Sequence, residues 1–259
     1  MNQTATSKLM RFLGARLTPG GEFGLHLTAG AALMMAAVAA FSEVAEDVAE
    51  NDGVAEFDLH VSNWMHANAQ EPYTSIMWLF THLHSVAGMC MLVALAAAFF
   101  WRRAERHGRY WLLALALSVP GGMLLNVALK HIYQRARPVF EEPMLTLATY
   151  SFPSGHTVAA TLFWGLVASY AVMTAQRWHV RCAVVAGATL MVVLAGISRI
   201  YLGAHYPSDV LGAMVEGCGW LAVCITGCST LRRRQAAKAA RAAEAAPAAE
   251  SRHSAQTKG

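Results

Sequence analysis

The sequence predicts an all-α, polytopic membrane protein with six transmembrane helices. Of its 259 residues, 56% are apolar and only 14% are charged, whereas a soluble domain usually carries about 25% charged residues. A membrane-spanning helix needs about 20 mostly apolar residues. Six stretches meet or nearly meet this length, and they lie at residues 24–42, 74–100, 110–129, 156–175, 182–200 and 210–229.

The first stretch follows the basic residues Lys8, Arg11 and Arg16, and a basic segment before an apolar run also resembles a signal peptide. Because this run is longer than the apolar part of a typical signal peptide, we expect it to be retained as a helix. The second stretch is long enough to tilt in the membrane, or to begin as a segment at the interface.

The remaining four stretches are expected to pack closely. The third contains Pro120-Gly121-Gly122, which predicts a kink whose freed backbone groups can be satisfied by neighbouring helices. Alanine, glycine and serine are abundant throughout the chain. Small residues of this kind allow helix backbones to approach one another in lipid.

The distribution of basic residues predicts that both termini are cytoplasmic, because short cytoplasmic loops carry an excess of Lys and Arg. With six spans, sixteen of the twenty Lys and Arg residues fall on the side that holds the termini. Four fall on the opposite side: Lys130, Arg135, Arg137 and Arg199. The acidic 43–71 loop, the 130–155 loop and the 198–209 loop are then extracytoplasmic.

We divide the chain into a six-helix transmembrane domain at residues 1–230 and a basic, Ala-rich cytoplasmic tail at 231–259, which is expected to be disordered. The basic blocks flank apolar runs, so membrane topology explains them and no nucleic-acid partner is predicted. The five cysteines lie in or beside apolar runs, and their odd number argues against a disulfide framework.

Lys130 and Arg137 lie seven residues apart in K-H-I-Y-Q-R-A-R-P, directly after the third apolar stretch. If the helix continues to Pro138, two turns place both cations on one face, where a phosphate group is their natural partner. Taken alone, the pair also fits an ordinary basic helix end that reaches the lipid headgroups. Asn126 is placed to orient Lys130, and Arg135 to touch a substrate headgroup.

The segment S-F-P-S-G-H-T leads into the fourth apolar stretch. Pro153 and Ser154 suit a helix start, and Gly155 lets a ligand approach the backbone closely. Free N–H groups at a helix N-terminus form an anion site, and His156 stands beside it. Taken alone, a simple loop before a helix also explains this tetrapeptide.

The segment S-R-I-Y-L-G-A-H-Y-P-S-D joins the fifth and sixth stretches. Pro207 is expected to begin a helix, which places Asp209 in its first turn. A carboxylate four residues after His205 can accept its N–H, fix its tautomer and leave the other ring nitrogen as a nucleophile. Arg199 adds a third cation. A structural cap beside an incidental histidine is the alternative for this pair.

All three segments lie at the same end of their spans, because consecutive spans alternate in direction. Ionisable groups gathered at a membrane boundary are functional by default, and these cations would repel one another unless an anion bound among them. The arrangement predicts an extracytoplasmic site that grips a phosphate group.

The same residues carry a resemblance to a known family. K-x6-R-P at 130–138, P-S-G-H at 153–156 and S-R-x5-H-x3-D at 198–209 resemble the three signature motifs of the type 2 phosphatidic acid phosphatases, which are related to bacterial acid phosphatases and vanadium haloperoxidases. Every signature position is present and in order. The resemblance implies a four-helix catalytic core related to the acid phosphatase and haloperoxidase fold.

The resemblance also implies a role for each matching residue. The phosphate oxygens would be held by Lys130, Arg137, Ser154, the Gly155 N–H and Arg199. His205 would attack phosphorus to form a phosphohistidine, with Asp209 orienting its ring, and His156 would protonate the leaving oxygen and later assist water.

No metal or cofactor is expected at this site. Phosphoryl transfer depends on positioning and charge neutralisation, which three cations and helix N–H groups can supply. The sequence also lacks an outward Asp/Glu/His cluster suited to Mg²⁺.

The predicted function is hydrolysis of a lipid phosphate or diphosphate by an integral protein of a bacterial inner membrane. Undecaprenyl diphosphate is our first choice of substrate, before phosphatidic acid and phosphatidylglycerophosphate. Two alternatives are a vanadate-dependent haloperoxidase, against which membrane embedding argues, and a non-catalytic lipid-phosphate binding or transport protein, which would be expected to have lost His156 or His205. The lipid itself, the preference for mono- or diphosphate and the oligomeric state stay open.

Overall fold

The computed structural model describes residues 25–50, 53–103 and 108–256, and all of its regular secondary structure is α-helical. Within these ranges the helices are α2 (Leu25–Glu50), α3 (Val54–Ala67), α4 (Tyr73–Leu83), α5 (Val86–Arg102), α6 (Gly108–Tyr133), α7 (Gly155–Thr174), α8 (Trp178–Tyr201) and α9 (Pro207–Gln256). The basic residues Lys8, Arg11 and Arg16, and residues 104–107 of the predicted cytoplasmic loop, lie outside the described residues. The all-α prediction is confirmed.

Five of the described helices are long and apolar enough to cross a membrane: α2, α6, α7, α8 and the 207–240 part of α9. Helices α4 and α5 pass the same test together, although they are bent by 56° at the break between them. Ser85 starts the new helix at this break, because its hydroxyl accepts the Gly88 N–H at 3.3 Å. Counted as one broken span, the pair completes the six predicted spans.

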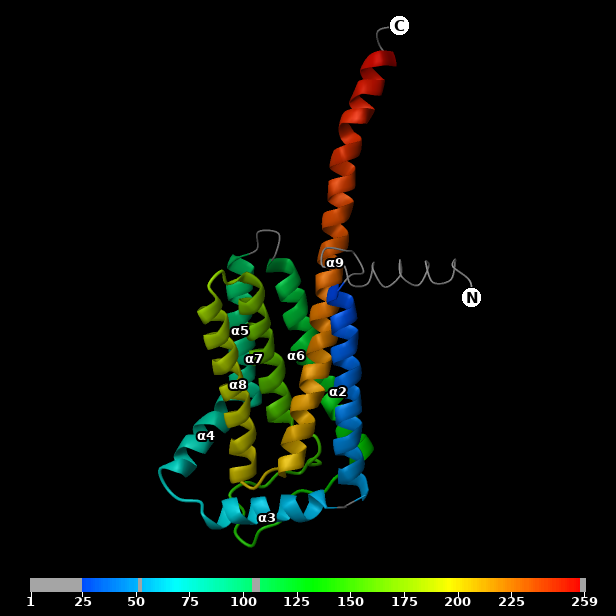
Figure 1. Cartoon of the computed structure of the whole chain (residues 1–259). Coiled ribbons are helices and arrows are strands. Elements are labelled where there is room, and N and C mark those ends of the chain that lie inside the picture. The colour runs from blue at the N-terminus through cyan, green and yellow to red at the C-terminus, as the bar shows by residue number, and fades with distance from the viewer. Residues whose placement is uncertain (1–24, 51–52, 104–107, 257–259) are drawn as a thin grey trace, which may run out of the picture. The chain divides into compact units, whose positions relative to one another are not determined.

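The acidic 43–71 segment is not the loop that the sequence predicts, because most of it belongs to α2 and α3. Helix α3 buries the polar residues Asp58 and Ser62, four positions apart on one face, and exposes Phe57 and Trp64. Figure 1 shows α3 lying across the ends of α8 and the start of α9. The most deeply buried side chains of α3 are therefore polar ones.

The C-terminal segment also differs from the expectation. Helix α9 continues through residue 231 to Gln256, where the sequence predicts a disordered tail. Alanine, arginine, lysine and glutamate dominate this segment, and these residues have high helix propensity. Propensity therefore outweighs the high charge of the tail.

The chain divides into two compact units. The larger unit comprises Leu33–Cys224 and holds every predicted site residue. The described residues of the smaller unit are 25–32 and 225–256. Within it, a Cβ added to Gly30 would collide with the Thr226 side chain, and His26 Nε2 lies 3.3 Å from the Thr230 hydroxyl.

Small residues let the helices of the larger unit approach closely, as the composition indicates. A Cβ added to Gly217 of α9 would lie 2.7 Å from the Thr161 side chain of α7. At Gly212 it would lie 2.6 Å from the ring of Phe152, which precedes α7. The start of α9 is thereby fixed against both α7 and the loop before it.

The α6–α7 and α8–α9 connections lie at the end of the larger unit that α3 covers (Figure 1). The two connections touch each other directly, since the Ser154 N–H donates to the Asp209 carbonyl at 3.1 Å. All three sequence motifs therefore meet at one end of the bundle.

Candidate active site

The helix that carries Lys130 ends earlier than the sequence predicts. Helix α6 stops at Tyr133, and Gln134 adopts a left-handed backbone conformation with φ 45°. The expectation that the helix continues to Pro138 and presents Lys130 and Arg137 on one face is therefore wrong. Proline also disfavours helical backbone at the residue before it, which keeps Arg137 off a helix.

Lys130 and Arg137 nevertheless converge on the backbone that leads into α7. Lys130 Nζ donates to the carbonyl oxygens of Tyr150 at 2.6 Å and Ser151 at 3.0 Å. Arg137 donates to the Tyr150 carbonyl at 3.1 Å, and to the carbonyl and hydroxyl oxygens of Thr149 at 2.7 and 2.9 Å. These oxygens carry no formal charge, so neither cation is neutralised by them.

The P-S-G-H segment forms the start of α7, as the sequence predicts. Ser154 is the N-cap residue and Gly155 is the first helical residue. Ser154 is fully buried, and its hydroxyl accepts a hydrogen bond from Thr157 at 3.0 Å. Phe152, two residues before Ser154, is also fully buried, and its ring packs between α2 and α6. This anchor fixes where the N-terminal N–H groups of α7 lie.

His205 is buried between a carboxylate and a guanidinium group. Its Nδ1 lies 3.3 Å from an Asp209 carboxylate oxygen, and its Nε2 lies 3.2 Å from Nη1 of Arg137. A guanidinium group can only donate hydrogen bonds and a carboxylate can only accept them. The ring proton therefore resides on Nδ1, and Nε2 presents a lone pair.

The environment of His205 also keeps the ring neutral. Burial lowers the pKa of His205 to about 3, with Arg137 and Lys130 acting in the same direction and Asp209 opposing them. A neutral imidazole whose Nε2 carries a lone pair is the form that can act as a nucleophile.

The carboxylate of Asp209 is fully buried and accepts hydrogen bonds on both oxygens. Oδ1 accepts from Nη1 of Arg135 at 2.6 Å. Oδ2 accepts from the Tyr206 N–H at 2.9 Å and from the Ser151 hydroxyl, in addition to facing His205. So many donors fix the position of the carboxylate, and with it the orientation of the imidazole.

Arg199 lies near the end of α8, is only 1% exposed, and donates from Nη1 to the Thr81 hydroxyl of α4 at 2.7 Å. Its Nε is a buried nitrogen without a hydrogen-bond partner. Both Lys130 and His156 lie within electrostatic reach of this guanidinium. Arg199 thus has a donor to offer to an anion bound among these groups.

His156 lies in the first turn of α7 and is partly exposed. Arg199, His205 and Arg137 all act on it electrostatically. The structure therefore brings together all eight residues that the sequence singled out: Lys130, Arg137, Ser154, Gly155, His156, Arg199, His205 and Asp209. A histidine with an available Nε2 lone pair, a second histidine and three cations at one end of a membrane bundle are suited to phosphoryl transfer.

Comparison with known proteins identifies the family of this chain. Residues 109–233 match the PAP2 superfamily. Phosphatidylglycerophosphatase B of Bacillus subtilis is 34% identical over 146 residues, which cover 55% of this chain and 68% of the relative. Undecaprenyl-diphosphatase BcrC of Bacillus subtilis is 32% identical over 145 residues, which cover 54% of this chain and 67% of the relative. The chain belongs to the PAP2 superfamily.

A solved structure supports the same assignment. The crystal structure of a transmembrane PAP2 type phosphatidylglycerolphosphate phosphatase from Bacillus subtilis matches with a TM-score of 0.66 and 27% identity, covering 74% of this chain and 93% of that one. The predicted fold and family are confirmed. The protein is an integral membrane protein of the PAP2 type lipid phosphatases and a phosphoric-ester hydrolase.

Arg135 has a different environment in this PAP2 protein from the one that the sequence predicts. In place of an open position at a substrate headgroup, its guanidinium forms ion pairs with Asp209 at 2.6 Å and with Asp58 at 2.7 Å. It also lies over the Tyr206 ring, 4.5 Å from the ring centroid. Asp58, on α3, was not predicted as a site residue.

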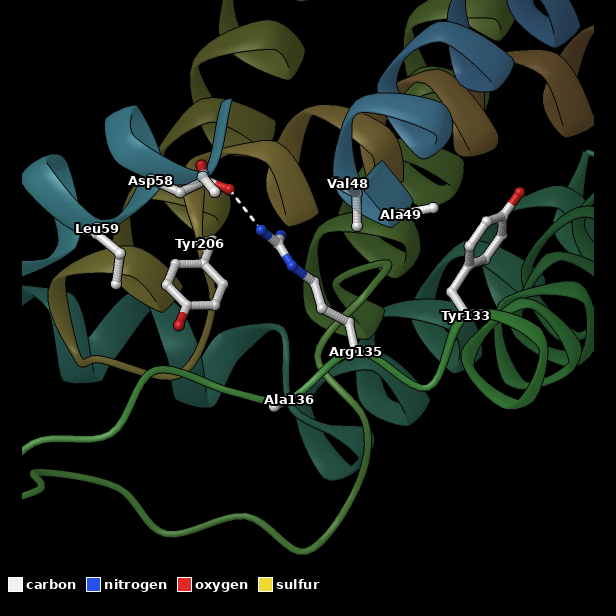
Figure 2. A pocket seen from close by; sticks show the side chains of 9 residues that line it. Val48, Ala49, Asp58, Leu59, Tyr133, Arg135, Ala136 and Tyr206 are labelled. Atoms are coloured by element: carbon white, nitrogen blue, oxygen red, sulfur yellow. Dashed lines mark hydrogen bonds and ion pairs between the residues drawn. The ribbon is translucent and has the colours of Figure 1, made fainter. Parts of the chain in front are cut away.

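A cavity of about 410 Å³ borders this ion pair. Figure 2 shows Arg135 pointing toward Asp58, with Tyr206 and Leu59 on one side of the cavity and Val48 and Tyr133 on the other. The cavity therefore lies beside the Asp58–Arg135 contact, and its lining does not include His205.

Asn126 also has partners other than the predicted one. Its Nδ2 donates to the Pro153 carbonyl at 3.3 Å and to Glu216 at 3.1 Å, so it supports the start of α7 in place of orienting Lys130. Glu216 is a buried acid within the sixth span. A carboxylate within an apolar stretch of sequence often indicates a functional residue. Glu216 holds Asn126, which in turn holds the P-S-G-H segment through the Pro153 carbonyl.

Among the described residues, no three or more His, Cys, Asp or Glu side chains are grouped to hold a metal ion.

Proposed function

We propose that this PAP2 protein hydrolyses the phosphomonoester or diphosphate of a membrane lipid at the extracytoplasmic face, through a phosphohistidine at His205. The observation that supports this most directly is the pair of contacts on the His205 ring. Nδ1 faces the Asp209 carboxylate and Nε2 faces the Arg137 guanidinium, which is the state of an imidazole ready to attack beside an anion-binding cation.

In the first step, His205 Nε2 attacks phosphorus while the bond between phosphorus and the lipid oxygen breaks. The Nη1 donor of Arg137 passes from Nε2 to a phosphate oxygen, which leaves the lone pair free to attack. Lys130, Arg199 and the N-terminal donors of α7 at Ser154 and Gly155 bind the remaining oxygens, where negative charge gathers in the transition state.

Two proton transfers by His156 complete the reaction. In its protonated form, His156 gives a proton to the departing lipid oxygen. It then accepts a proton from a water molecule, whose oxygen attacks phosphorus as the bond to His205 Nε2 breaks. Inorganic phosphate leaves, and His205 returns with its proton on Nδ1, held by Asp209.

The relatives supply two leads for the lipid. One bears the name phosphatidylglycerophosphatase B and the other undecaprenyl-diphosphatase BcrC. Both names describe a phosphate group carried by a membrane lipid. We place undecaprenyl diphosphate first and phosphatidylglycerophosphate second, ahead of phosphatidic acid.

The distribution of Lys and Arg supports a site on the extracytoplasmic side, with both chain termini in the cytoplasm. Glu142 lies in the α6–α7 connection beside the site, and Gln176 lies in the α7–α8 connection at the other ends of those helices; both are exposed. In cells expressing a cysteine-free background, an impermeant maleimide should label Glu142→Cys and spare Gln176→Cys. The reverse pattern would contradict the proposed orientation.

The test of function is phosphate release by the full-length protein in detergent from the three lipids. We expect at least one lipid to be hydrolysed, and His205→Ala and Arg199→Ala to lower kcat/KM by about a hundredfold or more, as is typical when one transition-state stabilising group is removed.

Matched controls lie at the opposite end of α8. His179→Ala removes an exposed histidine, and Arg181→Ala removes an arginine that donates to the Ala175 carbonyl. Both variants should keep kcat/KM within about threefold of the parent, because neither residue is near the site. Full activity in His205→Ala would exclude the phosphohistidine, whereas a parent protein that hydrolyses none of the three lipids would favour a lipid-binding protein.

A further inference from the structure

The guanidinium of Arg135 lies between two buried carboxylates that come from distant parts of the chain. Nη1 pairs with Asp209 at 2.6 Å. Nη2 pairs with Asp58 at 2.7 Å, and Figure 2 shows this second contact. The side chains of Asp58 and Asp209 are 1% and 0% exposed, and that of Arg135 is 12% exposed. The three groups therefore interact with little screening by solvent.

Asp58 is held by more than Arg135. Its Oδ1 accepts the Ser208 N–H at 3.0 Å, and its Oδ2 accepts the Ser208 hydroxyl. Ser208 lies in the first turn of α9, next to Asp209. A carboxylate from α3 thus occupies the N-terminus of α9, where negative charge is stabilised by the free N–H groups of a helix.

Asp58 sets the net charge of the cluster that it forms with Arg135 and Asp209. With His205 neutral, Asp58, Arg135 and Asp209 together carry one net negative charge. When Nε2 of His205 bonds to phosphorus and Nδ1 keeps its proton, the imidazole becomes a cation, and the cluster reaches zero net charge. Without Asp58 the same step would move a buried cluster from zero to a net positive charge, which burial opposes.

We propose that Asp58, acting through Arg135, is a positioning residue that holds Asp209 as an aligned anion on His205. The proposal rests on the proposed function of His205 as nucleophile. Asp58 draws the Arg135 guanidinium to one side, so that Asp209 keeps its capacity to accept the His205 N–H. Helix α3 therefore supplies one positioning residue, Asp58, and also covers the end of the bundle.

The first test is kinetic, on the full-length protein in detergent. Asp58→Asn keeps the shape of the side chain and removes its charge. We expect kcat to fall by about tenfold to a hundredfold, the range seen when a residue that hydrogen-bonds to and orients a directly acting group is removed. KM should stay within about threefold of the parent value. Asp58→Glu should recover part of kcat. The matched control Glu56→Gln removes an exposed carboxylate from the same helix and should leave kcat unchanged.

A double-variant cycle tests the route through Arg135. If Asp58 acts through this residue, Asp58→Asn combined with Arg135→Gln should lower kcat no further than Arg135→Gln alone, because residues in one network are not additive. Independent, multiplied losses would overturn the proposal. So would an Asp58→Asn variant whose thermal stability falls while its kcat stays within twofold of the parent, since Asp58 would then only anchor α3.

A spectroscopic arm separates this inference from the proposed function. In protein labelled with ¹⁵N-histidine, the Nδ1 proton of His205, assigned by its loss in His205→Ala, should move upfield in Asp58→Asn as Asp209 becomes a weaker acceptor. An unchanged resonance would overturn the proposal even if the enzyme were active. If the parent protein hydrolyses none of the lipids, the proposed function fails, while the shift still decides whether Asp58 controls the Asp209–His205 contact.

Discussion

Replacement of Asp209 by Asn should place the proton of His205 on the wrong nitrogen. Oδ1 of Asp209 faces Arg135, which can only donate, so the amide oxygen must take that place. The amide NH₂ then faces the Tyr206 N–H and His205 Nδ1, where Oδ2 accepted before. With a donor beside Nδ1, the imidazole proton moves to Nε2 and blocks the lone pair that attacks phosphorus.

The size of the loss can be worked out from these contacts. A hydrogen bond to a charged group contributes about 1.5–3 kcal/mol, and the donor placed against the Tyr206 N–H leaves a buried polar group unsatisfied, at about 1–3 kcal/mol. Together these effects raise the barrier by about 2.5–6 kcal/mol. Since 1.36 kcal/mol is a factor of ten in rate, kcat should fall by roughly two to four orders of magnitude.

The assay is kcat for phosphate release, measured beside the parent on the lipid that it hydrolyses best. Ser151→Ala is the matched control, because it removes one donor to Asp209 Oδ2 and leaves the tautomer in place; it should cost about tenfold or less. Retention of kcat within tenfold in Asp209→Asn would refute the tautomer argument, since no arrangement of the amide satisfies both Arg135 and the Nδ1–H of His205.

Three further predictions concern pH, packing and metal ions. Because burial lowers the pKa of His205 to about 3, the ring stays unprotonated as pH falls, and log kcat/KM should show no acid limb from this group between pH 7 and 5. A limb near pH 6.5 that persists after correction for substrate ionisation, measured by ³¹P titration, would contradict this. Gly212→Ala places a Cβ 2.6 Å from the Phe152 ring and should destabilise the protein by about 1–3 kcal/mol in thermal unfolding, whereas Gly187→Ala, which meets open space, should not. Phosphate release should survive EDTA, because three basic side chains neutralise the phosphate; a loss that added Mg²⁺ restores would show a metal requirement.

The sequence predicts that these residues gather at one end of the bundle because they sit at helix ends. Arg199 lies near the end of one span and Asp209 at the start of the next, so the short connection between them leaves no freedom about where they lie. Lys130 is fixed in the same way by the end of α6. Their assembly follows from alternating spans, and it needed no knowledge of side-chain contacts.

The details of contact could not be predicted in this way. Asp58 is separated along the chain by 77 residues from Arg135 and by 150 from Ser208, and in the sequence it is one of several acidic residues in a segment that resembles a loop. Local composition carries no information about which of these acids is buried. Only packing of α3 against α8 and α9 distinguishes Asp58 from Glu56.

Two arginines of one loop show why residue type and spacing are not enough to assign roles. Arg135 faces two carboxylates, and although burial opposes its charge, Asp209 and Asp58 raise its pKa. Arg137, two residues later, faces mainly carbonyl oxygens and His205, and burial lowers its pKa, with Asp209 opposing. The charge of Arg135 is therefore already balanced inside the protein, whereas that of Arg137 is not. An incoming phosphate would gain little from Arg135 and much from Arg137. We therefore propose phosphate binding for Arg137 and not for Arg135, although either would serve as a basic residue in a motif.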